Sequence, residues 1–454
     1  MFCVSTYAVS DKEYADFQNT NDFTGRLKLS IERFDAIRQK ADDGDAKAQF
    51  CIGVAFLRSL AVKIDLFEAL KYFQKSADAK NPDALCALGY IYLEGNIYKK
   101  DEKLAFKYFS ESAEQNNPYA QNALGVCYLK GLGVKKDTKK AIDLFYKAIS
   151  KSNSRAKISL AKCHLEGLGV ERNPSKALEL FKQASNEDNA IAQNNLGAFH
   201  AMGIMDGNAD YFNAVKLYQR SAEKNYDPAQ LALALCYLNG LGIDKNVNTA
   251  CYWFDQAIQN GNVDAINNLA VCYESGEAGL DKMEKAPALY KEAALRGSDV
   301  AMYNLANIYY NGGCKIPQNY KEAYKYFRKS AFKNNADAQS MLGIMFLEGQ
   351  GVEKSYEDAF KWLKKAANQG DPDALANLGK CYLEGIGVEA DPAVAIVYLK
   401  SGVDKENASA LALLGGCYAI GLGVEQNIDK AKLLLRKASE LGHEEAGRAL
   451  YRLN

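Results

Sequence analysis

The chain has 454 residues, of which 48% are hydrophobic and 25% are charged, so its composition is that of a folded globular protein. Lys plus Arg number 56 and Asp plus Glu number 56, which leaves no net charge to draw the chain to nucleic acid or to an anionic membrane. Only 8 Pro stand against 35 Gly, a balance that favours long helices separated by turns over proline-rich or disordered segments.

The start of the chain carries no targeting signal that we recognise. Residues 1–10 have neither a basic segment nor a sustained apolar run, so we expect no signal peptide. The longest uncharged apolar stretch, 408–424, is interrupted by glycines, so we expect no membrane insertion. Eleven cysteines lack the paired spacing of a disulfide framework, which favours reduced thiols in a cytoplasmic protein; export without a recognisable signal peptide is the alternative.

Two segments precede the regular part of the chain. Residues 1–25 are polar with interspersed aromatics and are expected to form an N-terminal tail. The segment 27–41 has the pattern of an amphipathic helix without a partner, so we assign 26–44 as an N-terminal capping helix.

From residue 45 to residue 443 one pattern repeats. Small residues recur at intervals of 36 residues, with two intervals of 37, and they anchor eleven units. These anchors are Gly53, Gly89, Gly125, Ala161, Gly197, Ala234, Ala270, Ala306, Gly343, Gly379 and Gly415.

Each unit is predicted to be a helical hairpin. Ala stands five residues before every anchor and Leu or Ile one residue before it, and an aromatic residue or His often stands three residues after it. This spacing marks the buried stripe of a first helix. A second series of alanines, from Ala69 to Ala431, is followed three and four residues later by aromatic or aliphatic pairs and marks a second helix. Six units join the helices by Gly-x-Gly and then Val or Ile, as in 131–134, where the first Gly suits a left-handed helix end.

The motifs Ala-x-x-x-Leu-Gly-x-x-Tyr, Gly-x-Gly-Val and Lys-Ala-x-x-x-Phe recur in this order, most fully in 120–148 and 374–395. With them the chain resembles the Sel1-like repeat family, a relative of the tetratricopeptide repeats. The resemblance implies an all-α, right-handed superhelix, or solenoid, of eleven hairpin repeats over 45–443, with a C-terminal capping helix over 444–454. It also implies a protein-binding scaffold or adaptor, because members of the family generally assemble other proteins.

Several patterns suggest chemistry but have simpler explanations. The Gly-x-Gly loops follow helices rather than strands, so we do not expect phosphate binding. Six cysteines, from Cys127 to Cys417, each lie two residues after an anchor, where a small apolar side chain suits a helix interface. His164 and His200 occupy one position in adjacent units, which fits either a shared metal site or two packed rings, and we favour the rings. We therefore predict no catalytic residue, no cofactor and no metal site.

The surface of the first helices is the predicted binding site. In the related tetratricopeptide architecture these helices line a concave groove, and positions three before and one after each anchor point away from the buried stripe. Apolar and amide side chains mix there, and Asn can both donate to and accept from the backbone of a bound peptide. We predict that a protein or peptide ligand contacts Asn122, Asn194, Asn267, Tyr303 and Asn307. The alternative for each Asn is a hydrogen bond inside a stacking interface.

The predicted function is a non-enzymatic scaffold or adaptor that binds a protein or peptide, with no nucleic-acid partner. One alternative is a secreted bacterial effector or host-interaction protein of the same fold, with an unrecognised export signal in 1–25. A second alternative, a hydrolase of cell-wall-related substrates, comes from the resemblance alone, because no residues that could carry the reaction are visible. The oligomeric state stays open.

Overall fold

The computed structural model describes residues 34–58, 62–95, 98–205 and 207–453. The predicted tail over 1–25 and the first part of the predicted capping helix over 26–44 lie outside these ranges. Residues 34–42 are helical, and the helix α25 (Glu444–Leu453) occupies the segment that we assign as the C-terminal cap.

The described residues form helical hairpins in succession, which confirms the predicted all-α solenoid of eleven repeats. The first helices are α3 (Ala46–Arg58), α5 (Pro82–Glu94), α7 (Pro118–Lys130), α9 (Ser154–Glu166), α11 (Ala190–Ala201), α13 (Asp227–Asn239), α15 (Val263–Glu274), α17 (Asp299–Asn311), α19 (Ala336–Glu348), α21 (Pro372–Glu384) and α23 (Ala408–Ile420). The second helices are α4 (Leu66–Asp78), α6 (Glu102–Glu114), α8 (Thr138–Ile149), α10 (Pro174–Asn186), α12 (Tyr211–Ala222), α14 (Val247–Gln259), α16 (Ala286–Leu295), α18 (Tyr320–Phe332), α20 (Tyr356–Asn368), α22 (Pro392–Val403) and α24 (Ile428–Glu440). A 3-10 segment, η2 (Leu280–Lys285), precedes α16.

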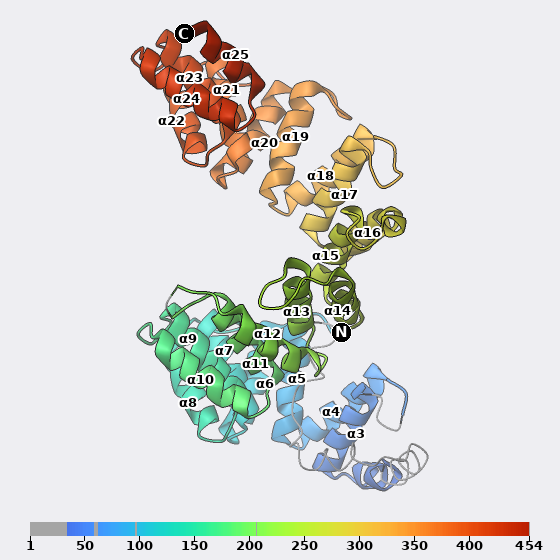
Figure 1. The fold of residues 1–454 in the computed structure, drawn as a ribbon. Helices are drawn as coiled ribbons and strands as arrows, with labels where there is room; N and C mark the ends of the chain where they lie inside the picture. Colours follow the sequence, from blue (N-terminus) through green and yellow to red (C-terminus); the bar gives the residue numbers. More distant parts are fainter. Residues whose placement is uncertain (1–33, 59–61, 96–97, 206, 454) are drawn as a thin grey trace. The chain divides into compact units, whose positions relative to one another are not determined.

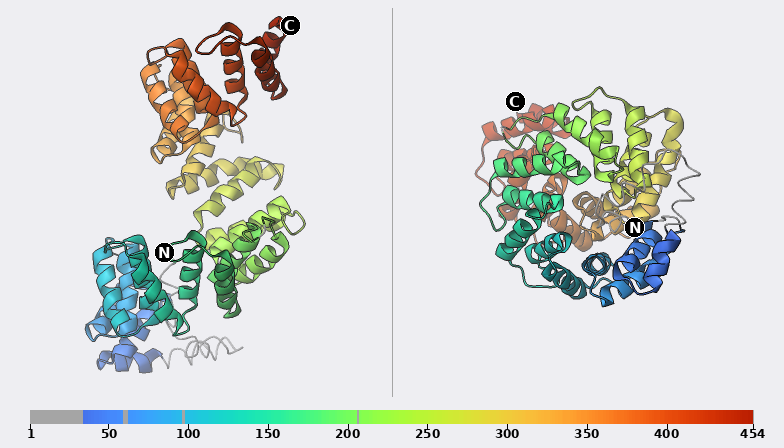
Figure 2. Two further views of the ribbon diagram at one scale, coloured as in Figure 1. Left: turned by 90° about the vertical axis from the view of Figure 1, so that its left-hand side faces the viewer. Right: turned by 90° about the horizontal axis from the view of Figure 1, so that it is seen from below.

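The chain divides into two compact units, Met1–Asn262 and Val263–Asn454. In the first unit the hairpins run from α3–α4 to α13–α14, and in the second they run from α15–α16 to α23–α24, where α25 packs against α24 (Figure 1). Within each unit successive hairpins lie side by side (Figure 2). Several successive first helices touch: α7 and α11 each touch α9, and α19 and α23 each touch α21. We call the first helices of a unit its first-helix layer.

Capping residues set the ends of the first helices. Asn117 precedes α7, and its side-chain oxygen accepts from the backbone N–H groups of Tyr119 and Ala120, both at 3.0 Å. Such a cap satisfies N–H groups that have no partner inside the helix. At the other end Gly131 adopts φ = 77° and donates its N–H to the carbonyl of Cys127 at 2.8 Å. This confirms the predicted role of the first loop glycine.

The anchor residue is small because the second helix of the same hairpin presses a large side chain against it. A Cβ atom on Gly125 would lie 2.6 Å from the ring of Phe145, which is fully buried. Ala120, five residues before this anchor, is also fully buried. The spacing seen in the sequence therefore marks the core of each hairpin, where truncating such a Phe to Ala costs about 3–5 kcal/mol.

The second glycine of the loop joins neighbouring repeats. Gly133 adopts φ = 68°, and a Cβ atom there would lie 2.1 Å from the carbonyl oxygen of Glu102, the first residue of α6 in the preceding repeat. A Cβ atom on Gly387 would likewise lie 2.1 Å from the carbonyl oxygen of Tyr356. Backbone-to-backbone contact of this kind leaves no room for any side chain.

Candidate functional site

The five predicted contact residues all lie on first helices, as expected, but in different units of the chain. Asn122 lies on α7 and Asn194 on α11, both in the first unit. Asn267 lies on α15, and Tyr303 and Asn307 lie on α17, all in the second unit. The structure brings Tyr303 and Asn307 together, one helical turn apart.

Two of the three predicted asparagines outside α17 bond to the next repeat. The Oδ1 atom of Asn122, which is buried, accepts from the Ser159 hydroxyl at 2.9 Å. The Oδ1 atom of Asn267 accepts from the Asn304 side-chain amide at 3.0 Å. Both donors lie 37 residues further along the chain, two residues before the anchor of the following repeat. These two side chains therefore take the stacking role that the sequence left open as an alternative.

Asn194 differs because the next repeat has no polar residue at the donor position. The residue at the donor position there is Ala232. The Asn194 side chain is half-buried and makes no hydrogen bond with any described residue. In the first unit, Asn194 is thus the predicted contact residue whose amide remains available.

Tyr303 lies in an acidic environment on the first-helix layer of the second unit. Its half-buried ring packs on Phe327 with the ring centroids 5.7 Å apart. Burial raises the pKa of Tyr303, whereas a hydrogen bond with Asn307 lowers it. Three carboxylates raise it further: those of Asp337, Asp371 and Asp373. We call these three residues the acidic cluster.

The acidic cluster comes from the starts of two successive first helices. Asp337 is in the first turn of α19, Asp371 caps α21, and Asp373 is in the first turn of α21. Asp371 is only 9% exposed, and its Oδ1 atom accepts from the N–H of Ala374 at 2.6 Å. None of the three carboxylates forms an ion pair with any described Lys, Arg or His. Burial, and after it the neighbouring carboxylates, hold the pKa of Asp371 above its usual value.

The acidic cluster was not predicted from the sequence, because its residues lie outside the two positions of each first helix that were expected to face a ligand. The signal lies further towards the helix start, eight and six residues before the anchor. Asn occupies the capping position before most first helices, but Asp371 replaces it before α21. Asp337 stands in the first turn one repeat earlier, so the substitution sets two carboxylates at one junction.

The histidines and cysteines pack within the stack. His164 Nδ1 lies 3.3 Å from the carbonyl oxygen of Glu171, and His200 Nδ1 lies 3.5 Å from Asp210 Oδ2, so each ring contacts the loop of its own repeat. Burial raises the pKa of Cys127 to about 12. Among the described residues, no group of three or more His, Cys, Asp or Glu is placed to hold a metal ion. No helix in the described ranges is long and apolar enough to cross a membrane.

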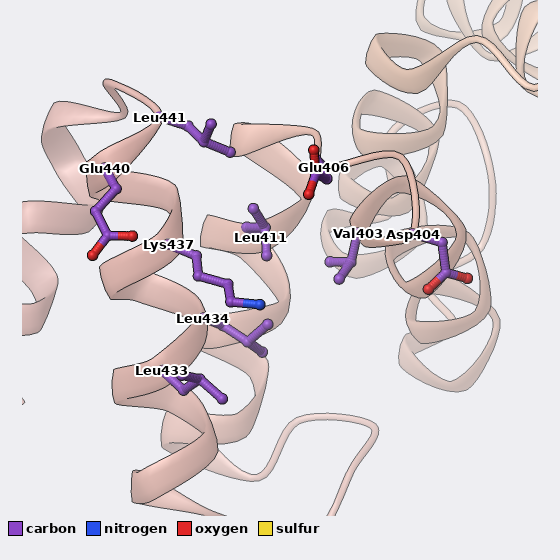
Figure 3. Close-up of a pocket in the computed structure, with 9 residues that line it drawn as sticks. All are labelled: Val403, Asp404, Glu406, Leu411, Leu433, Leu434, Lys437, Glu440 and Leu441. Carbon is purple, nitrogen blue, oxygen red and sulfur yellow. The ribbon is translucent and has the colours of Figure 1, made fainter. Parts of the chain in front are cut away.

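A hollow of about 410 Å³ lies between α22, α23 and α24 of the second unit, and Figure 3 shows Lys437 extending along it between leucine side chains. Two repeats earlier, Phe332 and Trp362 pack edge to face with centroids 5.5 Å apart. Asp404 and Leu434 occupy the equivalent sequence positions here. Smaller side chains therefore explain this hollow without a ligand.

Short helical hairpins that stack within each unit, with helix caps and loop glycines at many of their junctions, define an α-solenoid repeat protein. The Sel1 repeat family model matches residues 46–81, 82–117, 118–153, 154–189, 190–226, 227–262, 263–298, 299–334, 336–371, 372–407 and 408–443. The chain therefore belongs to the Sel1 repeat family.

Solved structures agree with this assignment. The chain is similar to a protective antigen of uropathogenic Escherichia coli strains that displays an SLR fold, with 29% identity over 92% of this chain and 90% of that chain and a TM-score of 0.57. It is also similar to a Sel1 repeat protein from Oxalobacter formigenes, with 24% identity over 84% of this chain and 99% of that chain and a TM-score of 0.50. The second likeness shows the fold alone. No curated protein matches the chain.

Proposed function

We propose that this chain is a non-enzymatic protein-interaction scaffold that holds a segment of a partner protein on its first-helix layer. Membership of the Sel1 repeat family supports the general role, because solenoids of this family commonly bind proteins and generally act without catalysis. The observation that carries the finer proposal is the neighbourhood of Tyr303 and Asn307. There an aromatic ring, an amide and carboxylates that form no ion pair with the described residues come from successive first helices.

These groups suit an extended peptide. The Tyr303 ring offers an apolar surface with a polar tip, a combination that is enriched at protein interfaces. The Asn307 amide can donate to and accept from a peptide backbone. In the first unit Asn194 offers the same chemistry, since its amide makes no hydrogen bond with the described residues. Asn122 and Asn267 have a smaller part in the proposal because the stack already uses them.

We also propose a cytoplasmic location, since every described cysteine is a free thiol, as expected in a reducing compartment. The proposal includes no nucleic-acid partner, because the formal net charge of the chain is zero.

Site-specific photo-crosslinking tests the scaffold proposal. A photoreactive aromatic amino acid is placed at Tyr303 in one variant and at Phe332 in the control, because Phe332 is a 65%-exposed aromatic side chain on a second helix. Both variants are incubated with lysate of the native host, and crosslinked proteins are identified by mass spectrometry. We expect a defined partner to crosslink at 303 and to disappear with the added substitution Asn307→Ala. Crosslinking that occurs only at 332, or equally at both positions, would contradict the proposal.

A further inference from the structure

The loops of the second and third repeats carry a charge that the other loops do not. Six loops of the chain read Gly-x-Gly and then Val or Ile, and in five of them the next residue is acidic: Glu171, Asp244, Glu353, Glu389 and Glu425. In the third repeat this residue is Lys135. The loops of the second and third repeats both end in Lys-Lys-Asp, at 99–101 and 135–137. Two successive repeats have therefore replaced the usual acid by lysines.

The structure places the lysines of both repeats around one hollow in the first unit. A Cβ atom on Gly133 would lie 2.1 Å from the carbonyl oxygen of Glu102, so the loop of the third repeat rests on the start of α6. A shallow hollow of about 660 Å³ lies at this contact, and Lys100, Lys103 and Lys135 line it. We call the exposed lysines of these two loops and of the helix starts that follow them the basic edge: Lys99, Lys100, Lys103, Lys135, Lys136, Lys139 and Lys140.

Most of this positive charge has no counterpart in the chain. Two of the three acids in the same segments serve as helix caps, since Asp101 accepts from the Leu104 N–H at 2.9 Å and Asp137 accepts from the Lys140 N–H at 3.0 Å. The third acid, Glu102, pairs with Lys100 at 2.8 Å. The remaining members of the basic edge, apart from Lys140, form no ion pair with any described residue: Lys99, Lys103, Lys135, Lys136 and Lys139.

The basic edge is strong but short. The starts of α6 and α8 add to it, because each helix N-terminus carries about half a positive charge. On one side the edge ends at the fourth repeat, whose loop rests on the start of α8: a Cβ atom on Gly169 would lie 2.8 Å from the carbonyl oxygen of Thr138. That loop carries Glu171 where the third repeat carries Lys135. A surface confined to two repeats, in a chain with zero net charge, suits a short anionic segment better than a long nucleic acid.

We propose that the basic edge binds a short segment of a partner protein that is rich in Asp or Glu. The inference rests on the scaffold function proposed above in taking the partner to be a protein, and it adds a second contact surface outside the first-helix layer. Carboxylates of the segment pair with the lysines around the hollow that have no acid of their own. Each exposed pair is weak, so recognition depends on several pairs together and weakens as salt is added.

Fluorescence anisotropy with the full chain tests the inference. The probe is a labelled peptide of about 12 residues that alternates Glu and Ser, and its neutral counterpart alternates Gln and Ser. We expect the Glu peptide to bind at least about tenfold more tightly than the Gln peptide at low salt. The double substitution Lys103→Glu with Lys135→Glu, both at the hollow, should weaken binding of the Glu peptide at least about fivefold.

The matched control uses the corresponding contact in the second unit. There a Cβ atom on Gly351 would lie 2.2 Å from the carbonyl oxygen of Tyr320, and exposed lysines stand at 321 and 354, but Glu353 is retained. Lys321→Glu with Lys354→Glu changes the net charge equally and should weaken binding less than about twofold. Thermal melting shows whether both double variants are folded, as expected from the exposure of all four lysines.

The other outcomes are distinguishable. Equal binding of the Glu and Gln peptides, or no binding of either, overturns the inference. An equal loss in the control also overturns it, because binding would then follow the net charge of the chain. If a single-stranded oligonucleotide of equal charge, or vesicles of phosphatidylcholine and phosphatidylserine, bind more tightly than the Glu peptide and depend equally on Lys103 and Lys135, the partner assignment is wrong. Photo-crosslinking at 303 reports on the first-helix layer, so it decides the scaffold function separately.

Discussion

Exchanging an amide and a carboxylate at two helix caps is predicted to change stability in opposite directions. Asp371→Asn replaces a carboxylate that Asp337 and Asp373 repel by an amide that can donate, and it should stabilise the second unit. Asn407→Asp removes the donor that Asp373 accepts at 2.7 Å and should destabilise it. Since Asn and Asp cap helices equally well, the capping contribution cancels in both variants. The main remaining change is the contact across the junction, together with the contact between residue 371 and the Ser340 hydroxyl.

The magnitude follows from the nature of that contact. A hydrogen bond to a charged group contributes about 1.5–3 kcal/mol, and the exposure of Asp337 and Asp373 reduces this value through solvent screening. We therefore expect each exchange to shift the free energy of unfolding by about 1–2 kcal/mol at neutral pH.

The shift has a defined pH dependence. The pKa of Asp371 is raised in the folded chain, mainly by burial, so folding favours its protonated form. The stability that this proton provides is complete below the ordinary Asp pKa of about 3.9 and is lost as the pH rises through the raised value. The advantage of Asp371→Asn over the unaltered chain should accordingly be largest near neutral pH and should shrink on acidification.

Hydrogen exchange with mass spectrometry is the suitable assay, because a repeat array need not unfold in two states and exchange reports each helix separately. Protection in α19 to α23 should rise in the first variant and fall in the second. Asn246→Asp is the control, since that side chain accepts from the Thr249 N–H at 3.0 Å and makes no other hydrogen bond with the described residues. Lower protection in Asp371→Asn would refute the reasoning, because it would mean that the hydrogen bonds that the Asp371 carboxylate accepts from Ala374 and Ser340 outweigh its repulsion from the neighbouring carboxylates.

Three further predictions concern the stack. Gly133→Ala should destabilise the chain by more than about 2 kcal/mol, because its Cβ would lie 2.1 Å from a carbonyl oxygen. Gly131→Ala, whose Cβ would have no atom nearer than 3.6 Å, should cost only the roughly 1 kcal/mol of left-handed backbone strain. Thermal melting compares the stabilities of the two variants. Lys80 ends its hairpin with φ = 64°, so Lys80→Gly should raise the urea midpoint, and an unchanged or lower midpoint would contradict this. Cys127, whose pKa burial raises to about 12, should resist iodoacetamide at pH 8 until the chain unfolds, and rapid labelling of the folded chain would show that the thiol is accessible.

The fold was predictable because its core uses short-range sequence periods. Each anchor packs against a side chain about 20 residues later in the same hairpin, as Gly125 packs against Phe145. The constraint repeats in every unit, so a local pattern specifies the whole array. The reason for the second glycine of the loop was harder to predict from the sequence. That reason, contact with Glu102 in the preceding repeat, appears only when the repeats are stacked.

The site was predictable only in part because the role of an asparagine depends on its neighbour in the next repeat. Asn122 and Asn194 occupy equivalent positions, yet Ser159 engages the first while Ala232 leaves the second without a partner. Comparing each Asn with the residue at the donor position of the next repeat would have distinguished the roles of Asn122 and Asn194. The same comparison would have revealed Asp371 against Asp337. The sequence alone does not say that the Ser340 hydroxyl is buried beside the Asp371 carboxyl, since this depends on how tightly the helices pack.

The hydrogen bond from an Asn that caps a first helix to the Asp in the first turn of the preceding first helix also bears on how such an array can grow. With the repeat boundaries of the Sel1 family, the repeat 82–117 contains both Asp83 and Asn117, and the repeat 372–407 contains both Asp373 and Asn407. A duplicated or transplanted repeat of this kind carries both the donor and the acceptor of this hydrogen bond, so the bond does not depend on the residues of the neighbouring repeats. The segment 336–371 instead carries Asp337, Ser340 and Asp371. Moving this one module would move Asp337 and Asp371 together but leave Asp373 behind, so it would carry a junction without an amide donor into another solenoid.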